Sequence, residues 1–192
     1  MLMIHCKKNI GFSLIEVLVT IVILMIGLLG LAGLQGRALT SQLESYQRSQ
    51  ALILVKDIEN RINANRKNAA NYVTATPLGT GAACPVAADP TVIADKDKEE
   101  WCNAIMGAAE VQSGVSSAGA MIGARGCVYQ IASPASGVAT PYLAVVAWQG
   151  LNNTKAPDVT TATSAGQCGA GQYGNESLHR VVTLPISIAD LN

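Results

Sequence analysis

The sequence lacks the residue combinations on which most catalytic and nucleotide-binding sites are built. Only one histidine, His179, follows the amino-terminal segment, so one chain cannot build a two-histidine metal site, and we interpret His179 as a surface or strand-end residue. No Gly-Lys-Ser/Thr loop is present to cradle a phosphate, and no serine lies in a Gly-x-Ser-x-Gly turn with an identifiable base. We therefore exclude an assembly ATPase, predict that the chain is not an enzyme, and expect no catalytic residue, cofactor or metal.

The chain also lacks net charge, with 13 basic and 13 acidic residues. No stretch combines dense Lys/Arg with stacking aromatic residues, which excludes nucleic acid as an expected partner. The charged run at 95–100, Asp-Lys-Asp-Lys-Glu-Glu, lacks the glycine and the spacing of a calcium-binding EF-hand loop. We interpret this run as the solvated start of a helix.

Hydrophobic residues are concentrated near the amino terminus. From Phe12 to Leu34 the only charge is Glu16, and a membrane-spanning helix needs about 20 predominantly apolar residues. The segment before this run carries Lys7 and Lys8 and no acid. By the positive-inside rule the amino terminus is expected to stay cytoplasmic, and everything after the apolar run is expected to be exported.

The cysteines agree with export. Cys6 precedes the apolar run, whereas an even set of four follows it: Cys84, Cys102, Cys127 and Cys168. Four cysteines in an exported segment indicate two disulfides and an oxidising compartment. Three pairings are open, and we favour Cys84 with Cys102 and Cys127 with Cys168 because sequential pairing closes compact loops.

One continuous helix is predicted from about residue 13 to 65. Its second half is amphipathic, with apolar residues at helical spacing and i,i+4 pairs of Glu44 with Arg48 and of Asp57 with Arg61. The apolar stripe consists of Leu39, Leu43, Tyr46, Leu52, Val55, Ile58 and Ile62. Glycines at 27, 30, 33 and 36 predict a locally soft segment, since each glycine costs about 1 kcal/mol relative to alanine.

The second half of the chain predicts strands at 126–132, 141–149 and 180–188, where β-branched and aromatic residues lie between Gly-, Pro- and Ser-rich loops. Pro185 cannot donate to a ladder, so the last strand is expected at an edge or bent there. For 77–124 the sequence predicts only loops and a disulfide. The fold class is α+β: a long amino-terminal helix packed on an antiparallel sheet, joined by disulfides.

The string Gly11-Phe12-Ser13-Leu14-Ile15-Glu16, with Lys8 upstream and an apolar helix downstream, resembles the prepilin processing motif of type IV pilins and type II secretion pseudopilins. The resemblance implies cleavage between Gly11 and Phe12 by a prepilin peptidase, and methylation of the new amino terminus at Phe12. It also implies that Glu16 sets subunit register by contacting the amino terminus of a neighbouring subunit. The alternative is a glutamate that marks the membrane boundary and reaches the headgroups.

Two further segments, 50–65 and the strand 145–150 that ends in Trp-Gln-Gly between cysteines, are similar to the PilV group of minor pilins. The resemblance implies the type IV pilin fold and four parts: a cleaved leader 1–11, a transmembrane or filament-core helix 12–34, its amphipathic continuation 35–72 and an exported head 73–192.

The same resemblance implies a minor pilin that primes pilus assembly at the tip and supports twitching motility and adhesion. Its partners would be other minor pilins, the major pilin, the prepilin peptidase, the inner membrane with the platform protein, and a tip adhesin. The chain would cross the inner membrane once before assembly and join the extracellular pilus afterwards. A minor pseudopilin of type II secretion is the alternative, and a tethered periplasmic enzyme or adhesin that keeps its leader is a third hypothesis.

Overall fold

The computed structural model describes residues 11–89, 91–107, 111–112, 116–117, 121–133, 137–161 and 163–189. The predicted leader, with Cys6, Lys7 and Lys8, lies outside the described residues except for Gly11. The chain divides into two compact units, Met1–Gln42 and Leu43–Asn192.

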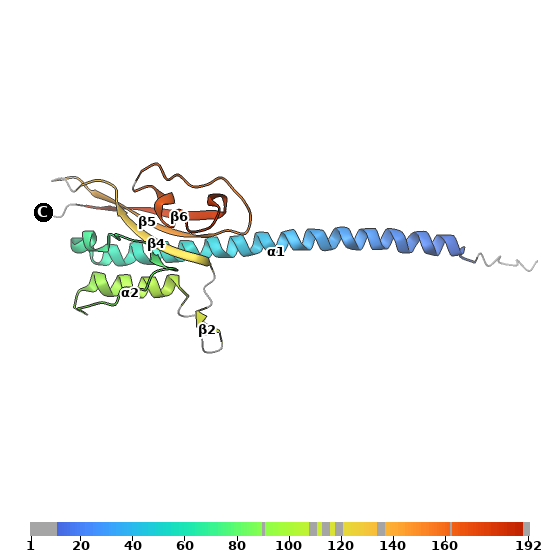
Figure 1. Ribbon diagram of the computed structural model, residues 1–192, viewed down its shortest axis with the longest axis horizontal. Coiled ribbons are helices and arrows are strands. Elements are labelled where there is room, and N and C mark those ends of the chain that lie inside the picture. Colours follow the sequence, from blue (N-terminus) through green and yellow to red (C-terminus); the bar gives the residue numbers. More distant parts are fainter. Residues whose placement is uncertain are drawn as a thin grey trace, which may run out of the picture. The chain divides into compact units, whose positions relative to one another are not determined.

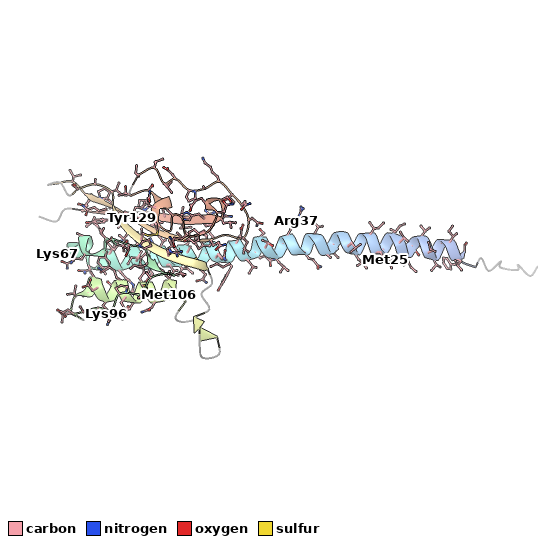
Figure 2. The ribbon with its side chains drawn as sticks, viewed as in Figure 1. Met25, Arg37, Lys67, Lys96, Met106 and Tyr129 are labelled. Atoms are coloured by element: carbon pink, nitrogen blue, oxygen red, sulfur yellow. A yellow bond between two sulfur atoms is a disulfide. The ribbon has the colours of Figure 1, made fainter. Side chains whose placement is uncertain are left out.

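Helix α1 runs from Leu14 to Ala64, which confirms the continuous helix predicted over 13–65 (Figure 1). It passes without interruption through the four glycines at 27–36, so the softness predicted there stays a prediction. Its side chains from Leu14 to Leu39 are exposed, as Figure 2 shows for Met25. This part of the helix buries nothing against its own unit.

The second unit contains a four-stranded antiparallel sheet in the order β1-β4-β5-β6. The strands are β1 Leu78–Gly79, β4 Ile122–Gln130, β5 Thr140–Gln149 and β6 His179–Ile188. A separate pair joins β2 Val111–Gln112 to β3 Ser116–Ser117. The strands predicted at 141–149 and 180–188 therefore agree with β5 and β6, and the expected α+β arrangement is confirmed.

The bounds of one strand differ from the prediction. β4 begins before the predicted 126–132, because the chain still pairs with β5 beyond an irregularity between Ile122 and Arg125, where Gly123 has φ +62°. β6 lies at the sheet edge, as Pro185 predicts. Pro185 pairs with Leu143 without a register shift, so the edge alternative is the one that the structure shows.

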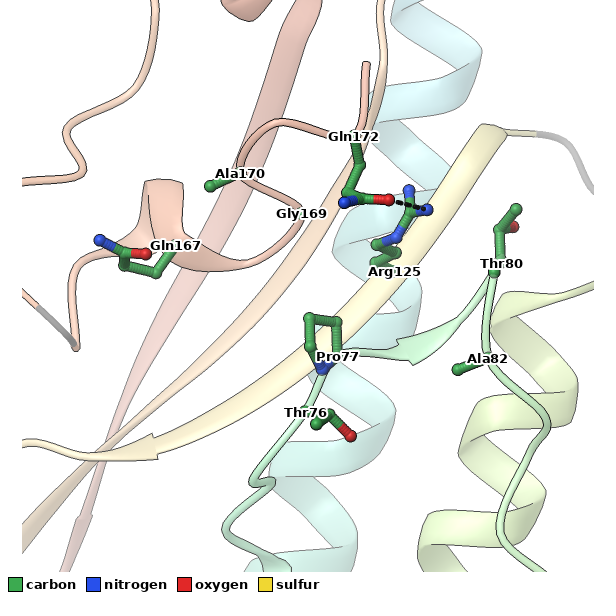
Figure 3. A pocket seen from close by; sticks show the side chains of 10 residues that line it. Thr76, Pro77, Thr80, Ala82, Arg125, Gln167, Gly169, Ala170 and Gln172 are labelled. Carbon is green, nitrogen blue, oxygen red and sulfur yellow. Dashed lines mark hydrogen bonds between the residues drawn. The ribbon is translucent and has the colours of Figure 1, made fainter. Parts of the chain in front are cut away.

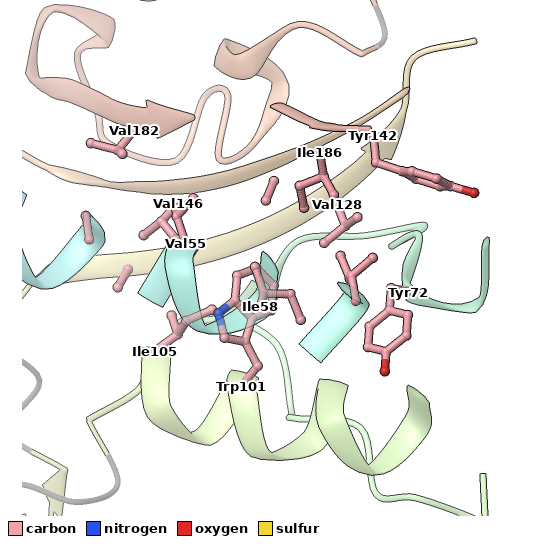
Figure 4. Packing of buried hydrophobic residues seen from close by; sticks show 14 of the residues in the cluster. Val55, Ile58, Tyr72, Trp101, Ile105, Val128, Tyr142, Val146, Val182 and Ile186 are labelled. Atoms are coloured by element: carbon pink, nitrogen blue, oxygen red, sulfur yellow. The ribbon is translucent and has the colours of Figure 1, made fainter. Parts of the chain in front are cut away.

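The main core lies between the second half of α1 and one face of the sheet (Figure 4). The helix contributes Ala51, Val55, Ile58 and Ile62, and the sheet contributes Val128, Ala144, Val146 and Trp148. Trp148 of β5 is buried in this core.

The predicted apolar stripe of α1 is only half right. Leu43 and Tyr46 are exposed, whereas Val55 and the residues in register with it are buried. Leu43 and Val55 are 55 − 43 = 12 positions apart, which places them about 120° apart around a helix of 3.6 residues per turn. The sequence spacing thus combined two faces of one helix into a single stripe.

Helix α2, Ile93–Ile105, contains the charged run 95–100 that was interpreted as a helix start, whereas the rest of 77–124 was expected to form loops. Its buried face carries Trp101 and Ile105, which pack on β4 at Gly126, where an added Cβ would collide with both side chains. Trp101 also donates its Nε1–H to the backbone carbonyl of Leu54 on α1 at 2.9 Å. The helix therefore closes the side of the core that α1 and the sheet leave open.

Short 3₁₀ helices complete the head: η1 Arg66–Tyr72, η2 Ala165–Gln167 and η3 Glu176–Leu178. A second, smaller core forms around the buried disulfide partners Cys127 and Cys168, with Val145, Ala147 and Tyr173. Because successive strand residues face opposite sides, this cluster covers the face of the sheet opposite α1. The long segment between β5 and β6 supplies that cover.

Candidate functional site

The junction between Gly11 and Phe12 lies in non-helical chain directly before α1. The carbonyl of Ser13 accepts hydrogen bonds from the N–H groups of Glu16 and Val17, at 3.0 and 3.3 Å, which closes the first helical turn just beyond it. Phe12 is 84% exposed, and no other described residue lies within 4 Å of a Cβ added to Gly11. The junction is thus an accessible, unpaired segment of the kind that proteases cleave.

Glu16 lies in the first turn of α1, where the helix dipole favours a negative charge. It is exposed among apolar neighbours, including Ile15 and Val17, and no cation pairs with it within the described chain. A carboxylate carried into hydrocarbon without a partner is costly. If this turn of the helix enters a bilayer or a filament core, the carboxylate of Glu16 therefore needs a cation or a hydrogen-bond donor there.

The first half of α1 meets the physical requirement for a membrane span. Its most apolar 18-residue window has a mean hydropathy of 2.8, and none of that window is buried. In the described part of the chain, it is the one helix long and apolar enough to cross a bilayer by length and composition.

In the head unit, Glu44 joins α1 to the segment that follows β5. Its Oε1 accepts hydrogen bonds from the N–H groups of Leu151 and Asn152, at 3.1 and 3.0 Å, and lies 3.5 Å from Nη2 of Arg180. The predicted pairing of Glu44 with Arg48 is wrong, because these tertiary donors take the carboxylate instead. This contact fixes the loop beside the helix.

Arg61 is the centre of a second network in the head. The predicted pair with Asp57 is present at 3.0 Å, and Nη1 of Arg61 also binds Asp97 at 2.9 Å and Glu100 at 2.7 Å on α2. Burial alone would lower the pKa of Arg61, but the hydrogen bonds to Glu100 and Asp97 outweigh it and raise that pKa. Burial and a hydrogen bond to Asp97 raise the pKa of Tyr72 to about 12.

Two acidic residues of the charged run 95–100 therefore pair with Arg61 of α1. Asp97 and Glu100 lie on α2 and face Arg61, so the run is more than a solvated helix start. In the part of the chain that the structure describes, no group of three or more His, Cys, Asp or Glu side chains could hold a metal ion.

The disulfides join Cys84 to Cys102 and Cys127 to Cys168, as the sequential pairing requires. The first fastens the loop before α2 to that helix. The second fastens the long segment between β5 and β6 to the centre of the sheet. Both lie in the second unit and close its two cores.

His179 begins β6 but is not a surface residue, since it is 1% exposed. Its Nδ1 lies 2.8 Å from Oε2 of Glu176 and its Nε2 lies 3.0 Å from the carbonyl oxygen of Cys168. Burial raises the pKa of Glu176, but hydrogen bonds from His179 and from the N–H of Gly171 outweigh it and lower that pKa. The strand-end position of His179 is thus confirmed, whereas its expected exposure at the surface is wrong because the disulfide-linked segment folds over it.

The structure defines a class of protein in which an accessible junction precedes an exposed apolar helix, and this helix continues into a disulfide-bonded head of helices and an antiparallel sheet. Comparison with known families then gives two adjoining matches. The model of the prokaryotic N-terminal methylation motif matches residues 6–32, and that of the type IV pilin Tt1218 matches residues 33–97. No curated protein and no solved structure gives a significant match.

Together the two matches support a type IV pilin, and the helix, sheet and disulfides agree with the fold of that family. Type IV pilins are structural subunits that assemble with other pilins after processing by a prepilin peptidase. The methylation motif and the apolar helix fit a membrane-anchored pilin that is later incorporated into a pilus.

Several residues that organise the head carry no signal in the sequence pattern. Asp97 and Glu100 are 36 and 39 positions from Arg61, so no helical spacing could connect them. Arg125 likewise has no sequence neighbour that marks it, although it lies at a pocket described below. Only the assembly of α2 and β4 in space brings these side chains to their partners.

Proposed function

We propose that this chain is a minor pilin of the PilV kind, which primes assembly of a type IV pilus and lies at or near its tip. The observation that carries the proposal is the order of features along α1: the accessible Gly11–Phe12 junction, Glu16 one turn later, and a long unburied apolar helix. Cleavage at this junction would place a charged amino group at Phe12, four residues from Glu16. In a filament, the corresponding amino group of a neighbour would satisfy the Glu16 carboxylate.

The head unit offers a second support for assembly. Leu43, Tyr46 and Ile53 follow one another at helical spacing on α1, and all three are about half exposed or more. They lie away from the buried face formed around Val55. A stripe of this kind on a well-packed unit indicates contact with another protein surface, and helices of neighbouring pilins are the partners that we propose.

The first experiment is intact-mass analysis of the membrane-extracted chain, expressed with and without its prepilin peptidase. We expect the peptidase to remove residues 1–11 and the product to carry one methyl group. An uncleaved chain, or cleavage near Gly33, would overturn the pilin proposal.

A variant series tests the role of Glu16 in assembly. Glu16→Gln should be processed normally yet enter sheared pili at least tenfold less than the wild type, because the register contact loses its charge. Arg48→Gln is the matched control, since Arg48 is an exposed charge on the same helix, and it should enter pili normally. If Glu16→Gln and Arg48→Gln enter pili equally well, Glu16 has no role in subunit register and only marks the membrane boundary.

Deletion of the gene separates the two assembly systems. Loss of surface pili and twitching with normal exoprotein secretion supports the minor pilin. Loss of secretion with normal pili would support a minor pseudopilin, which shares the same amino-terminal features.

A further inference from the structure

A pocket of about 370 Å³ opens on the head, between the loop that contains β1 and the turn that follows η2 (Figure 3). Arg125 of β4 lies between these two segments, with its guanidinium beside Gln172 in the figure. The pocket lies entirely in the second unit and shares no residue with the processing junction. It is therefore independent of the assembly role proposed above.

Arg125 is a buried cation whose described partners are all neutral. It is 8% exposed, its Nη1 donates to the carbonyl of Gly123 at 3.1 Å, and its Nη2 donates to Oε1 of Gln172 at 3.2 Å. Its Cζ lies 5.4 Å from the ring centroid of Tyr173. Among the described residues, no carboxylate lies within ion-pair distance of it. Buried charges in proteins are usually paired, so this cation calls for an anion.

The space beside the guanidinium is kept open by a glycine. A Cβ added to Gly81 would lie 2.9 Å from Nη2 of Arg125, and the φ of +89° at Gly81 also disfavours other residues. A guanidinium has five N–H donors, of which the two described hydrogen bonds use two. The remaining donors are sufficient for a bidentate carboxylate.

The rest of the lining suits a ligand with hydroxyl groups. Thr76, Thr80 and Gln172 are lining residues with hydroxyl or amide groups, and Pro77 adds an apolar ring. The pocket volume exceeds what a carboxylate alone needs. A small polar body attached to the carboxylate would fill it and find hydrogen-bond partners on several sides.

An extended peptide fits the site less well. A peptide that adds to a sheet edge needs a run of free backbone groups, and β1 beside the pocket is only two residues long. We propose that this pocket binds the carboxylate of an acidic sugar, such as a uronic acid of a polysaccharide, with Arg125 as its countercharge. The pilin head would thereby carry a recognition site for acidic glycans.

The test is titration of the full-length chain, purified in a detergent without sugar headgroups, with glucuronate, glucose and N-acetylglutamate methylamide. Binding is followed by calorimetry and by saturation-transfer NMR at low salt. We expect saturable binding of glucuronate at least about tenfold tighter than that of glucose, because only the acid can pair with the guanidinium.

Two variants decide whether Arg125 carries the effect. Arg125→Gln removes the cation, and Gln172→Glu places a carboxylate on the existing hydrogen bond to it. Both should lower the affinity for glucuronate at least about tenfold, while Arg66→Gln, which removes an exposed cation elsewhere on the head, should leave it unchanged. If Arg125→Gln fails to fold, Gln172→Glu decides alone, since Gln172 is exposed.

Several outcomes would overturn the proposal. They are equal affinity for glucose and glucuronate, unchanged affinity in Gln172→Glu, and no saturable binding of glucuronate up to about 10 mM. Equal or tighter binding of N-acetylglutamate methylamide would assign the pocket to an acidic side chain of a protein partner instead.

Discussion

Replacing Arg61 by methionine tests whether the charge network holds α2 on the head. Methionine keeps much of the apolar stem of the side chain but removes three charge-assisted contacts, to Asp57, Asp97 and Glu100. Hydrogen bonds to charged groups contribute about 1.5–3 kcal/mol each when buried, and exposed ion pairs contribute about 0–1 kcal/mol. Because Asp57 and Glu100 are substantially exposed and Asp97 is not, we expect a total loss of about 2 kcal/mol.

The assay is thermal unfolding of the full-length protein, followed by near-ultraviolet circular dichroism. Trp101 of α2 is fully buried and hydrogen-bonded to α1, so its signal reports directly on whether α2 stays docked. For a unit of this size, a loss of about 2 kcal/mol lowers the midpoint by about 4–8 °C. Arg66→Met is the control, since Arg66 is exposed and should change the midpoint little.

A double-mutant cycle with Asp97→Asn isolates the contact between the two helices. We expect Arg61→Met and Asp97→Asn to be non-additive by about 1 kcal/mol, because each removes the same ion pair. Additive effects, or an Arg61→Met midpoint equal to that of Arg66→Met, would refute the view that this network fixes α2.

Three further predictions concern the head. Replacing Cys127 and Cys168 by alanine should lower the free energy of unfolding by about 4 kcal/mol, and replacing Cys84 and Cys102 should lower it by about 3 kcal/mol. The first loss is larger because the Cys127–Cys168 bond closes a longer loop and so removes more chain entropy from the unfolded state. Urea unfolding measures both losses. Gly126→Ala should cost about 1–3 kcal/mol by pushing α2 away from β4, read as a lower thermal midpoint. The lowered pKa of Glu176 means that its carboxylate stabilises the fold above the unfolded pKa of about 4.3, and that this contribution is lost as the pH falls through the folded pKa. Acid titration of Glu176→Gln should therefore show a smaller loss of stability over that interval than the wild type.

The features predictable from the sequence are those that local pattern determines. α1 follows from an unbroken run of helix-compatible residues without proline, and β5 and β6 follow from β-branched runs bounded by loops. Pro185 limited β6 to an edge position or a bend, since a proline cannot donate to a ladder, and the structure shows the edge position. Each of these inferences needs only residues that are close in the sequence.

What the sequence could not predict depends on contacts between distant segments. α2 lies in a charged stretch whose apolar residues are few, and its stability comes from Trp101, the disulfide to Cys84 and the pairing with Arg61. The burial of His179 depends on a segment that the Cys127–Cys168 bond holds in place. The exposed stripe on α1 has the same cause. Packing against the sheet and α2 determines which face of the helix is buried, and the apolar residues Leu43, Tyr46 and Ile53 on the other face stay exposed and accessible to a partner outside the chain.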